Sequence, residues 1–305
     1  MTTPAITVGY GPSGAGKSVD ALLSAPCALY LTAAPGGLSA WVRLTGVKPR
    51  EEQVASIDHA IKVLRQNPDA RTVVLDDFSI LAERSHLSLD SSGKKGWDVW
   101  KALQKSVLRL RENCIERNIT LIMNAHEAPP KTNDDGTFTL GGPKMPSKAM
   151  STALPHIANL VLRCEHDSFA QPPAWTGSYV CNPSDGRWLT KDRYCVIGKK
   201  APMNLREILM RAAESGHDVS VPTRAPGLEW LDAAAEGVAK GLASGQIANP
   251  TEAASVLTHH CRGKDPRHIR WAWRDGCARH ALRSADDLFA MFQPNTPAAT
   301  GAAAG

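Results

Sequence analysis

The chain has 305 residues, of which 43% are hydrophobic and 21% are charged, and its formal net charge is +5. This composition is typical of a globular protein and excludes wholesale disorder. No apolar run approaches the ~18 residues that a membrane helix needs, and the first residues, MTTPAITVGY, lack the basic and apolar regions of a signal peptide. We therefore expect a cytoplasmic protein with no membrane partner.

The seven cysteines are scattered along the chain and form no CxxC pair. Such spacing is unlike a disulfide framework or a four-cysteine zinc site. The histidines and cysteines between residues 259 and 280 match no zinc-finger spacing either. We expect reduced thiols and no structural zinc.

The first part of the chain alternates short apolar runs with amphipathic stretches. Strands are expected at residues 5–10, 27–33, 72–78 and 119–127. Helices are expected from residue 17 to 24, in the stretch 51–66, and from about residue 100 to 118. This alternation predicts an α/β fold with a mostly parallel sheet and helices on both faces.

The rest of the chain changes character twice. Residues 128–150 are rich in Pro, Gly, Asn and Asp and are expected to form a long mobile loop. Further strands are expected at 157–166, 177–182 and 193–198, and a helix at 205–215.

A linker is expected at residues 217–227, so that a core of residues 1–220 is followed by a small helical domain of residues 221–292. The helices expected in that domain are 228–243, 250–258, 266–281 and 285–292. Residues 293–305 are expected to be a disordered tail.

One motif, GYGPSGAGKS at residues 9–18, lies between the first expected strand and the first expected helix. It contains G-x-x-x-x-G-K-[ST], in which backbone N–H groups surround the phosphates of a nucleotide. Lys17 is expected to reach the β- and γ-phosphates, and Ser18 to bind Mg²⁺. The predicted nucleotide-binding residues are Gly11, Pro12, Ser13, Gly14, Ala15, Gly16, Lys17 and Ser18.

Two carboxylates end the apolar run TVVLDDF. Asp76 is expected to hold Mg²⁺ through water, and Asp77 either orients the attacking water or simply begins a solvated loop. The chain has no Asn-Lys-x-Asp guanine-reading motif and no LSGGQ-like element, so ATP is the expected nucleotide. A small-molecule kinase is an alternative, although residues 128–150 offer lysines rather than the arginines typical of a kinase lid.

The chain resembles the phage-encoded RecA-like ATPases that accompany single-strand annealing proteins, also called phage AAA-type nucleotide-binding proteins. The resemblance covers roughly residues 5–200 and rests on YGPSGAGKS, VVLDDFS, NAHE, GGPKMPSKAMSTALPHIANLVLR and TKDRY. It implies an ATP-dependent RecA-type core that binds single-stranded DNA and assists recombination or annealing in the host cytoplasm.

The resemblance also implies roles for particular residues. Asn124, and with it His126, corresponds to a polar sensor of the γ-phosphate, although a polar strand tip can also merely end a sheet. Lys131, Lys144 and Lys148 lie where the family has a DNA-contacting loop, unless that loop is only solvated. Lys191 and Arg193 resemble residues that reach a neighbouring subunit's nucleotide, with a surface charge cluster as the alternative.

One departure from the family is the stretch LTAAPGG at residues 31–37, where RecA-like ATPases usually have a glutamate that activates water. Either Asp77 takes that role, or hydrolysis is slow and the protein works as an ATP-bound switch.

The C-terminal region carries a basic segment with two tryptophans, HHCRGKDPRHIRWAWRDGCARHALR at residues 259–283. In a helix over 266–281, one face would present Arg267, Arg270, Trp271 and Arg274. That face suits single-stranded DNA, with a solvated helix and a packed tryptophan as the alternative.

Together these features predict an ATP-binding, Mg²⁺-dependent and DNA-stimulated ATPase that acts as a homo-oligomer on single-stranded DNA in phage recombination or replication. One alternative is a nucleotide-gated loader that recruits an annealing or single-strand-binding protein with negligible hydrolysis. The other is the small-molecule phosphotransferase.

Overall fold

The structure is a computed structural model of the whole chain. It describes residues 2–34, 38, 42, 45–93, 96–166, 177–181, 186–248, 252, 253, 255, 257 and 264–292. The predicted tail at 293–305 lies outside the described residues, as does most of the helix predicted at 250–258.

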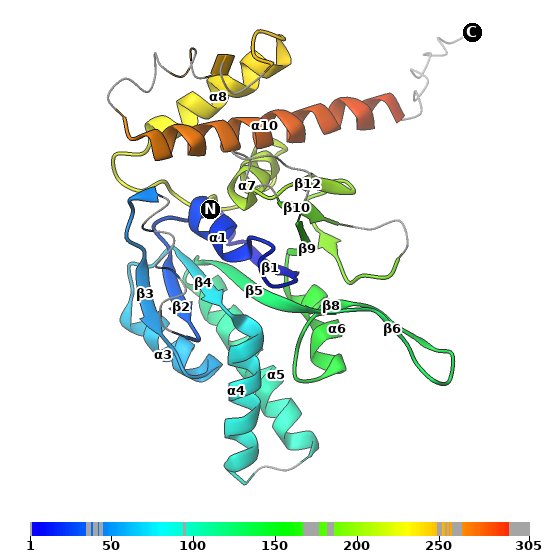
Figure 1. Cartoon of the computed structure of the whole chain (residues 1–305). Coiled ribbons are helices and arrows are strands. Elements are labelled where there is room, and N and C mark those ends of the chain that lie inside the picture. The colour runs from blue at the N-terminus through cyan, green and yellow to red at the C-terminus, as the bar shows by residue number, and fades with distance from the viewer. Residues whose placement is uncertain are drawn as a thin grey trace, which may run out of the picture.

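A central sheet runs through the molecule in the order β12-β10-β9-β1-β5-β4-β2-β3 (Figure 1). The strands from β9 to β3 in this order pair in parallel, and β10 and β12 are added antiparallel at one end. Their bounds are β1 (Ile6–Gly11), β2 (Leu29–Thr32), β3 (Arg50–Gln53), β4 (Thr72–Asp76), β5 (Thr120–Ala128), β9 (Leu160–His166), β10 (Gly177–Val180) and β12 (Lys200–Pro202). The predicted α/β class with a mostly parallel sheet is confirmed.

Helices cover both faces of the sheet, which explains why β1 is buried at every residue. On one face α3 (Ile57–Gln66), α4 (Phe78–Ser91), α5 (Trp97–Glu116) and α6 (Lys148–Ile157) bury Leu64, Phe78, Leu110 and Leu154. On the other face lie α1 (Lys17–Ser24), α7 (Leu205–Glu214), α8 (Trp230–Ala243) and α10 (Pro266–Phe292). Figure 1 shows these two layers below and above the sheet.

Some elements differ from those predicted. Residues 50–53 form β3 before the helix that was predicted over 51–66. The strand predicted at 193–198 is wrong, because that segment is a turn between β11 (Lys191–Asp192) and β12. The helices predicted at 266–281 and 285–292 are a single helix, α10. Short apolar runs do not distinguish a buried turn from a strand.

The segment 128–150 is more ordered than the predicted loop. It contains a hairpin of β6 (Lys131–Thr132) and β7 (Phe138–Thr139), which projects from the body in Figure 1. It also contains β8 (Gly142–Pro143), which pairs with the end of β5, and its last residues begin α6. Ser147 starts that helix because its hydroxyl accepts the N–H of Met150.

The C-terminal helices pack on the face that carries α1 and α7. Their buried residues, among them Leu231, Val238 and Leu282, join one apolar cluster with residues of the sheet. Arg224, within the predicted linker, is only 8% exposed. The predicted core and the predicted C-terminal domain therefore share buried surface.

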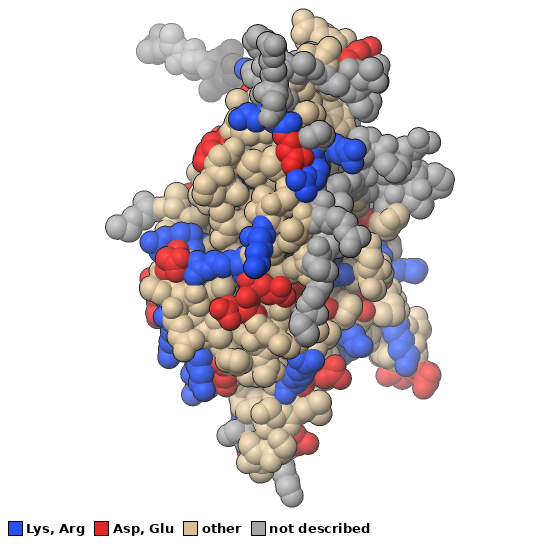
Figure 2. Space-filling model, turned by 60° about the vertical axis from the view of Figure 1, so that its left-hand side comes forward, with Lys and Arg blue, Asp and Glu red and all other residues tan. Residues whose placement is uncertain are grey.

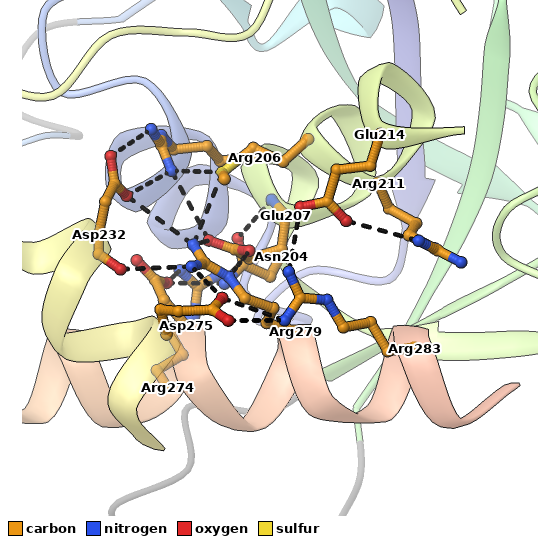
Figure 3. Close-up of polar contacts among 12 residues, drawn as sticks. Asn204, Arg206, Glu207, Arg211, Glu214, Asp232, Arg274, Asp275, Arg279 and Arg283 are labelled. Carbon is orange, nitrogen blue, oxygen red and sulfur yellow. Dashed lines mark hydrogen bonds and ion pairs between the residues drawn. The ribbon is translucent and has the colours of Figure 1, made fainter. Parts of the chain in front are cut away.

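A network of arginines and carboxylates lies between these helices (Figure 3). Arg206 pairs with Asp232 at 2.8 Å, Arg224 with Asp275 at 2.6 Å, and Arg279 with Glu207 at 2.8 Å. Arg274 pairs with Asp20 of α1. Buried charges need such partners, since an unpaired one is strongly destabilising.

On the face shown in Figure 2, Lys and Arg side chains are interspersed with Asp and Glu, so the net positive charge is not gathered there. Among the described residues, no helix is long and apolar enough to span a membrane.

Candidate nucleotide-binding site

The phosphate-binding motif at residues 11–18, called the P-loop below, connects β1 to α1. Gly14 and Gly16 have φ angles of 80° and 90°, which residues with a side chain rarely adopt. Gly16 is the N-cap of α1, and no side chain caps the helix there. The N–H groups of the first turn are therefore directed toward the space where phosphates would bind.

The Lys17 side chain packs against the P-loop backbone. Its side-chain nitrogen donates to the carbonyl oxygens of Gly11 at 2.9 Å and Pro12 at 2.8 Å. Only 9% of the residue is exposed. A γ-phosphate would offer this ammonium group a charged partner in place of two carbonyls.

The P-loop forms one wall of a cavity of about 260 Å³. Lys17 and Ser18 are among the P-loop residues that line it, and Asp76 and His126 line it from other strands. Its position follows from the parallel sheet, because the ends of β1, β4 and β5 meet at one edge. The sequence predicted these residues separately, and the fold brings them together.

Asp76 occupies the end of β4 beside the P-loop. Burial raises the pKa of its carboxyl group, and so does the neighbouring Asp77, whereas Ser18, Asn124 and Lys17 lower it. The hydroxyl of Ser18 and the carboxylate of Asp76 are hard oxygen ligands, which Mg²⁺ prefers, and Mg²⁺ takes its other ligands from water and phosphate. This donor set fits the predicted metal.

Asp77 uses both carboxylate oxygens. One accepts the N–H groups of Ser79 at 2.7 Å and Ile80 at 3.3 Å, and so caps α4. The other lies 2.8 Å from Nε2 of His126. The peptide bond between Asp76 and Asp77 is cis. Asp77 thus lines the cavity, and a helix and a histidine fix its position.

Asn124 lies in β5, directly opposite Gly9 of β1. It is 3% exposed, and its side chain lowers the pKa of the Asp76 carboxyl group. The predicted sensor residue is therefore adjacent to the predicted metal ligand.

A second cavity, of about 380 Å³, adjoins the first. His126 lines both cavities. The second cavity is bounded by α4, through Glu83 and His86, and by the segment before α6, through Lys144.

Lys191 and Arg193 lie at the opposite edge of the sheet. Lys191 pairs with Val161 near the amino end of β9, which runs parallel to β1. Its ammonium group donates to the carbonyls of Pro155 at 2.6 Å and Ala158 at 2.9 Å, where α6 ends. Arg193 is exposed. Neither lies at this chain's own nucleotide cavity.

The predicted DNA-binding residues fall into two groups. Lys131, Lys144 and Lys148 are exposed, as are Arg267 and Arg270. The predicted exposure of Trp271 and Arg274 is wrong: they are 3% and 6% exposed. The guanidinium of Arg224 lies over the Trp271 ring, 5.5 Å from its centroid, and Arg274 pairs with Asp20. Helical spacing alone did not show which face α8 and α7 would cover.

Comparison with known proteins finds no matching family model and no matching curated protein. The chain is similar to solved structures of low identity. They include the KaiC-like protein PH0186 from Pyrococcus horikoshii OT3, with 13% identity, a TM-score of 0.38 and coverage of 66% of this chain and 85% of that chain.

Two further similar structures are the RadB recombinase and the flagellar accessory protein FlaH from Methanocaldococcus jannaschii. RadB has 15% identity and a TM-score of 0.39, with coverage of 66% of this chain and 87% of its own. FlaH has 11% identity and a TM-score of 0.36, with coverage of 59% and 77%.

Two features of the site were not predicted from the sequence. The pairing of His126 with Asp77 joins two strand ends, and only the adjacency of β4 and β5 reveals it. Trp97, which is 68% exposed, lies beside the start of α6. The available signal was the dipeptide GW after two lysines, but local sequence does not distinguish an exposed tryptophan from a buried one.

Proposed function

We propose that this protein binds ATP with Mg²⁺ and hydrolyses it as a RecA-type P-loop ATPase. The observation that carries this proposal is the joint lining of one cavity by Lys17, Ser18 and Asp76. Lys17 would hold the β- and γ-phosphates, and the N–H groups at the start of α1 would hold the phosphate oxygens. When bound through Ser18 and Asp76, Mg²⁺ supplies neutralisation of the charge that develops on the phosphates.

We further propose that single-stranded DNA stimulates this activity. Trp97 lines a cavity with Ser147 and Ala149, the sequence neighbours of the exposed Lys148, and Lys144 lines the second cavity. Exposed aromatic rings stack on bases, while lysines neutralise phosphates. This arrangement supports a DNA-contacting surface next to the nucleotide site rather than on α10.

The finer biological role rests on the sequence motifs. YGPSGAGKS and VVLDDFS resemble those of phage RecA-like ATPases, which supports a cytoplasmic role in phage recombination or replication. In that role the chain would form a homo-oligomer and work with an annealing or single-strand-binding protein. The exposed Arg193 is then the better candidate to reach a neighbouring nucleotide, because Lys191 is held by two carbonyls.

A small-molecule phosphotransferase is a second candidate. The 380 Å³ cavity beside the nucleotide site favours it, because Glu83, His86 and Lys144 offer polar groups to an acceptor.

Phosphate release from ATP and Mg²⁺, measured with and without single-stranded DNA, tests the proposal. We expect DNA to raise the rate, and Lys17→Ala to abolish both turnover and ATP binding. Lys62→Ala, an exposed lysine on α3, is the matched control and should leave both unchanged.

Tight ATP binding without phosphate release would contradict hydrolysis and favour the nucleotide-gated loader. ADP formation that depends on a small acceptor instead of DNA would favour the phosphotransferase. Unchanged nucleotide affinity in Lys17→Ala would overturn the nucleotide site itself.

A further inference from the structure

His126 of β5 lies directly opposite Gly11, the first residue of the P-loop, on the neighbouring strand β1. In the parallel pairing of β1 with β5, Gly11 is the partner of His126. The Gly11 carbonyl is one of the two groups that hold the Lys17 ammonium, at 2.9 Å. His126 also lines the same cavity as Lys17, which is where we propose that the γ-phosphate binds.

The ring is held on one side by Asp77, whose oxygen lies 2.8 Å from Nε2. The backbone of His126 is fixed as well, since its N–H donates to the Ser79 hydroxyl at 2.9 Å and its carbonyl accepts the N–H of Lys144 at 2.7 Å. In a neutral imidazole one nitrogen carries the proton and the other accepts, and a carboxylate close to one nitrogen favours the proton on that nitrogen.

The second ring nitrogen, Nδ1, has no hydrogen-bond partner within the part of the chain that the structure describes. The side chain is 40% exposed, and it borders the 380 Å³ cavity as well as the nucleotide cavity. The second cavity therefore gives water a route to the imidazole while the phosphates occupy the first cavity.

Asp77 itself is poorly placed to activate water, because one oxygen caps α4 and the other lies 2.8 Å from Nε2 of His126. The stretch LTAAPGG supplies no carboxylate either. We propose that His126 is the general base of hydrolysis and that Asp77 is the residue that positions it. This inference rests on the proposed ATPase function, whose catalytic base it names.

In this step the water oxygen forms a bond to the γ-phosphorus. The bond from that phosphorus to the β–γ bridging oxygen breaks, and ADP leaves with the electron pair. Nδ1 of His126 takes the water proton, and the Asp77 carboxylate stabilises the resulting imidazolium. The proton then passes to solvent, which restores the neutral ring.

The test compares His126→Ala with native protein in steady-state hydrolysis and in binding of a non-hydrolysable ATP analogue with Mg²⁺. A general base contributes typically 10²–10⁴-fold, so we expect kcat to fall by about that factor while the dissociation constant of the analogue stays unchanged. Imidazole added to His126→Ala should restore part of kcat, because the second cavity admits it. His156→Ala, an exposed histidine on α6, is the control and should behave as native protein.

Asp77→Asn separates positioning from structure. Its amide oxygen can still accept the Ser79 N–H and cap α4, but it no longer offers a carboxylate to the imidazolium. We expect the same stability as native protein, an unchanged KM and a lowered kcat.

Three outcomes would overturn the inference. One is an unchanged kcat in His126→Ala while native protein hydrolyses ATP, which leaves the ATPase function standing. Another is a loss of kcat matched by a loss of analogue binding, which would assign His126 to nucleotide binding. The third is a kcat deficit that imidazole does not relieve. Native protein that binds ATP without turnover would instead overturn the ATPase function, and this inference with it.

Discussion

Arg274 of α10 donates a hydrogen bond to Asp20 in the first turn of α1, the helix that begins with the P-loop lysine. Their side chains are 5% and 2% exposed. Asp20 also accepts hydrogen bonds from the Tyr179 hydroxyl and from the N–H of Leu205, at 3.2 Å. One carboxylate therefore joins α1 to β10, α7 and α10.

We predict that Arg274→Met destabilises the protein strongly. The substitution leaves Asp20 buried without its cation, and breaking a buried pair in this way typically costs about 3–5 kcal/mol. Urea unfolding measures the loss. Arg270→Ala, an exposed arginine on the same helix, should change the free energy of unfolding by no more than about 0.5 kcal/mol.

The double variant Asp20→Asn with Arg274→Met should recover part of the loss, because the uncompensated charge is gone. Equal stability of Arg274→Met and Arg270→Ala would show that the pair contributes nothing. For the same reason, truncation before α8 perturbs the fold and is a poor test of DNA binding by α10.

A second prediction concerns the start of the P-loop. A Cβ added to Gly11 would lie 2.5 Å from the carbonyl oxygen of Cys164, on the neighbouring strand. Gly11→Ala should therefore push β1 from β9, lower the free energy of unfolding by about 1–3 kcal/mol and weaken ATP binding. Unfolding and nucleotide titration measure the two effects.

Gly9→Ala is the matched control for that prediction. At Gly9 the nearest atom to a new Cβ is Oδ1 of Asn124 at 3.5 Å, an ordinary contact. The Gly9→Ala variant should therefore be as stable as native protein. Equal behaviour of the two variants would argue against close packing of the P-loop on β9.

The start of α10 predicts a pH effect. Asp265 accepts the N–H of Arg267 at 2.9 Å, and Pro266 is the first residue of the helix. Hydrogen bonds from Arg267 lower the pKa of Asp265 to about 2, below the ~3.9 of an unfolded chain. The ionised cap thus stabilises the fold above pH ~3.9, and this contribution is lost as the pH falls from there toward 2.

Asp265→Ala should lower the free energy of unfolding by about 0.5–2 kcal/mol at pH 7, the usual cost of a lost cap. Its difference from native protein should narrow as the pH falls from ~3.9 toward 2, because in that range the unfolded chain binds a proton at Asp265 before the folded protein does. Urea unfolding at pH 7 and at a pH below ~3.9 measures this difference in the free energy of unfolding. Asp265→Asn, which caps without titrating, should retain most of the stability, and a difference that widens in acid would refute the cap.

The DNA surface gives a fourth prediction. Trp97→Ala should lose about 1–3 kcal/mol of single-stranded DNA binding if a base stacks on the exposed ring. Lys144→Ala should reduce the salt slope of the affinity by about 0.7, and Lys62→Ala should not change it. Fluorescence anisotropy at several salt concentrations measures both quantities. Weaker binding in Arg270→Ala but not in Trp97→Ala would place the DNA on α10 instead.

Local sequence predicted the residues of the candidate nucleotide site. The P-loop spacing, its setting between a strand and a helix, and Asp76 at a strand end each depend on a few adjacent residues. Their physical requirements, glycine where φ is positive and a carboxylate at a sheet edge, are visible in ten residues or fewer. The α/β class followed from the alternation of apolar runs for the same reason.

Other features depended on contacts between distant segments. Asp77 meets His126 because β5 lies between β1 and β4, an order that no local pattern specifies. Trp271 and Arg274 were expected on an open face of a basic helix, but α10 packs on α7 and α8 and buries both. Helical periodicity determined which residues of this chain share a face, whereas tertiary packing alone decided which face was covered, because burial depends on what another segment brings to it.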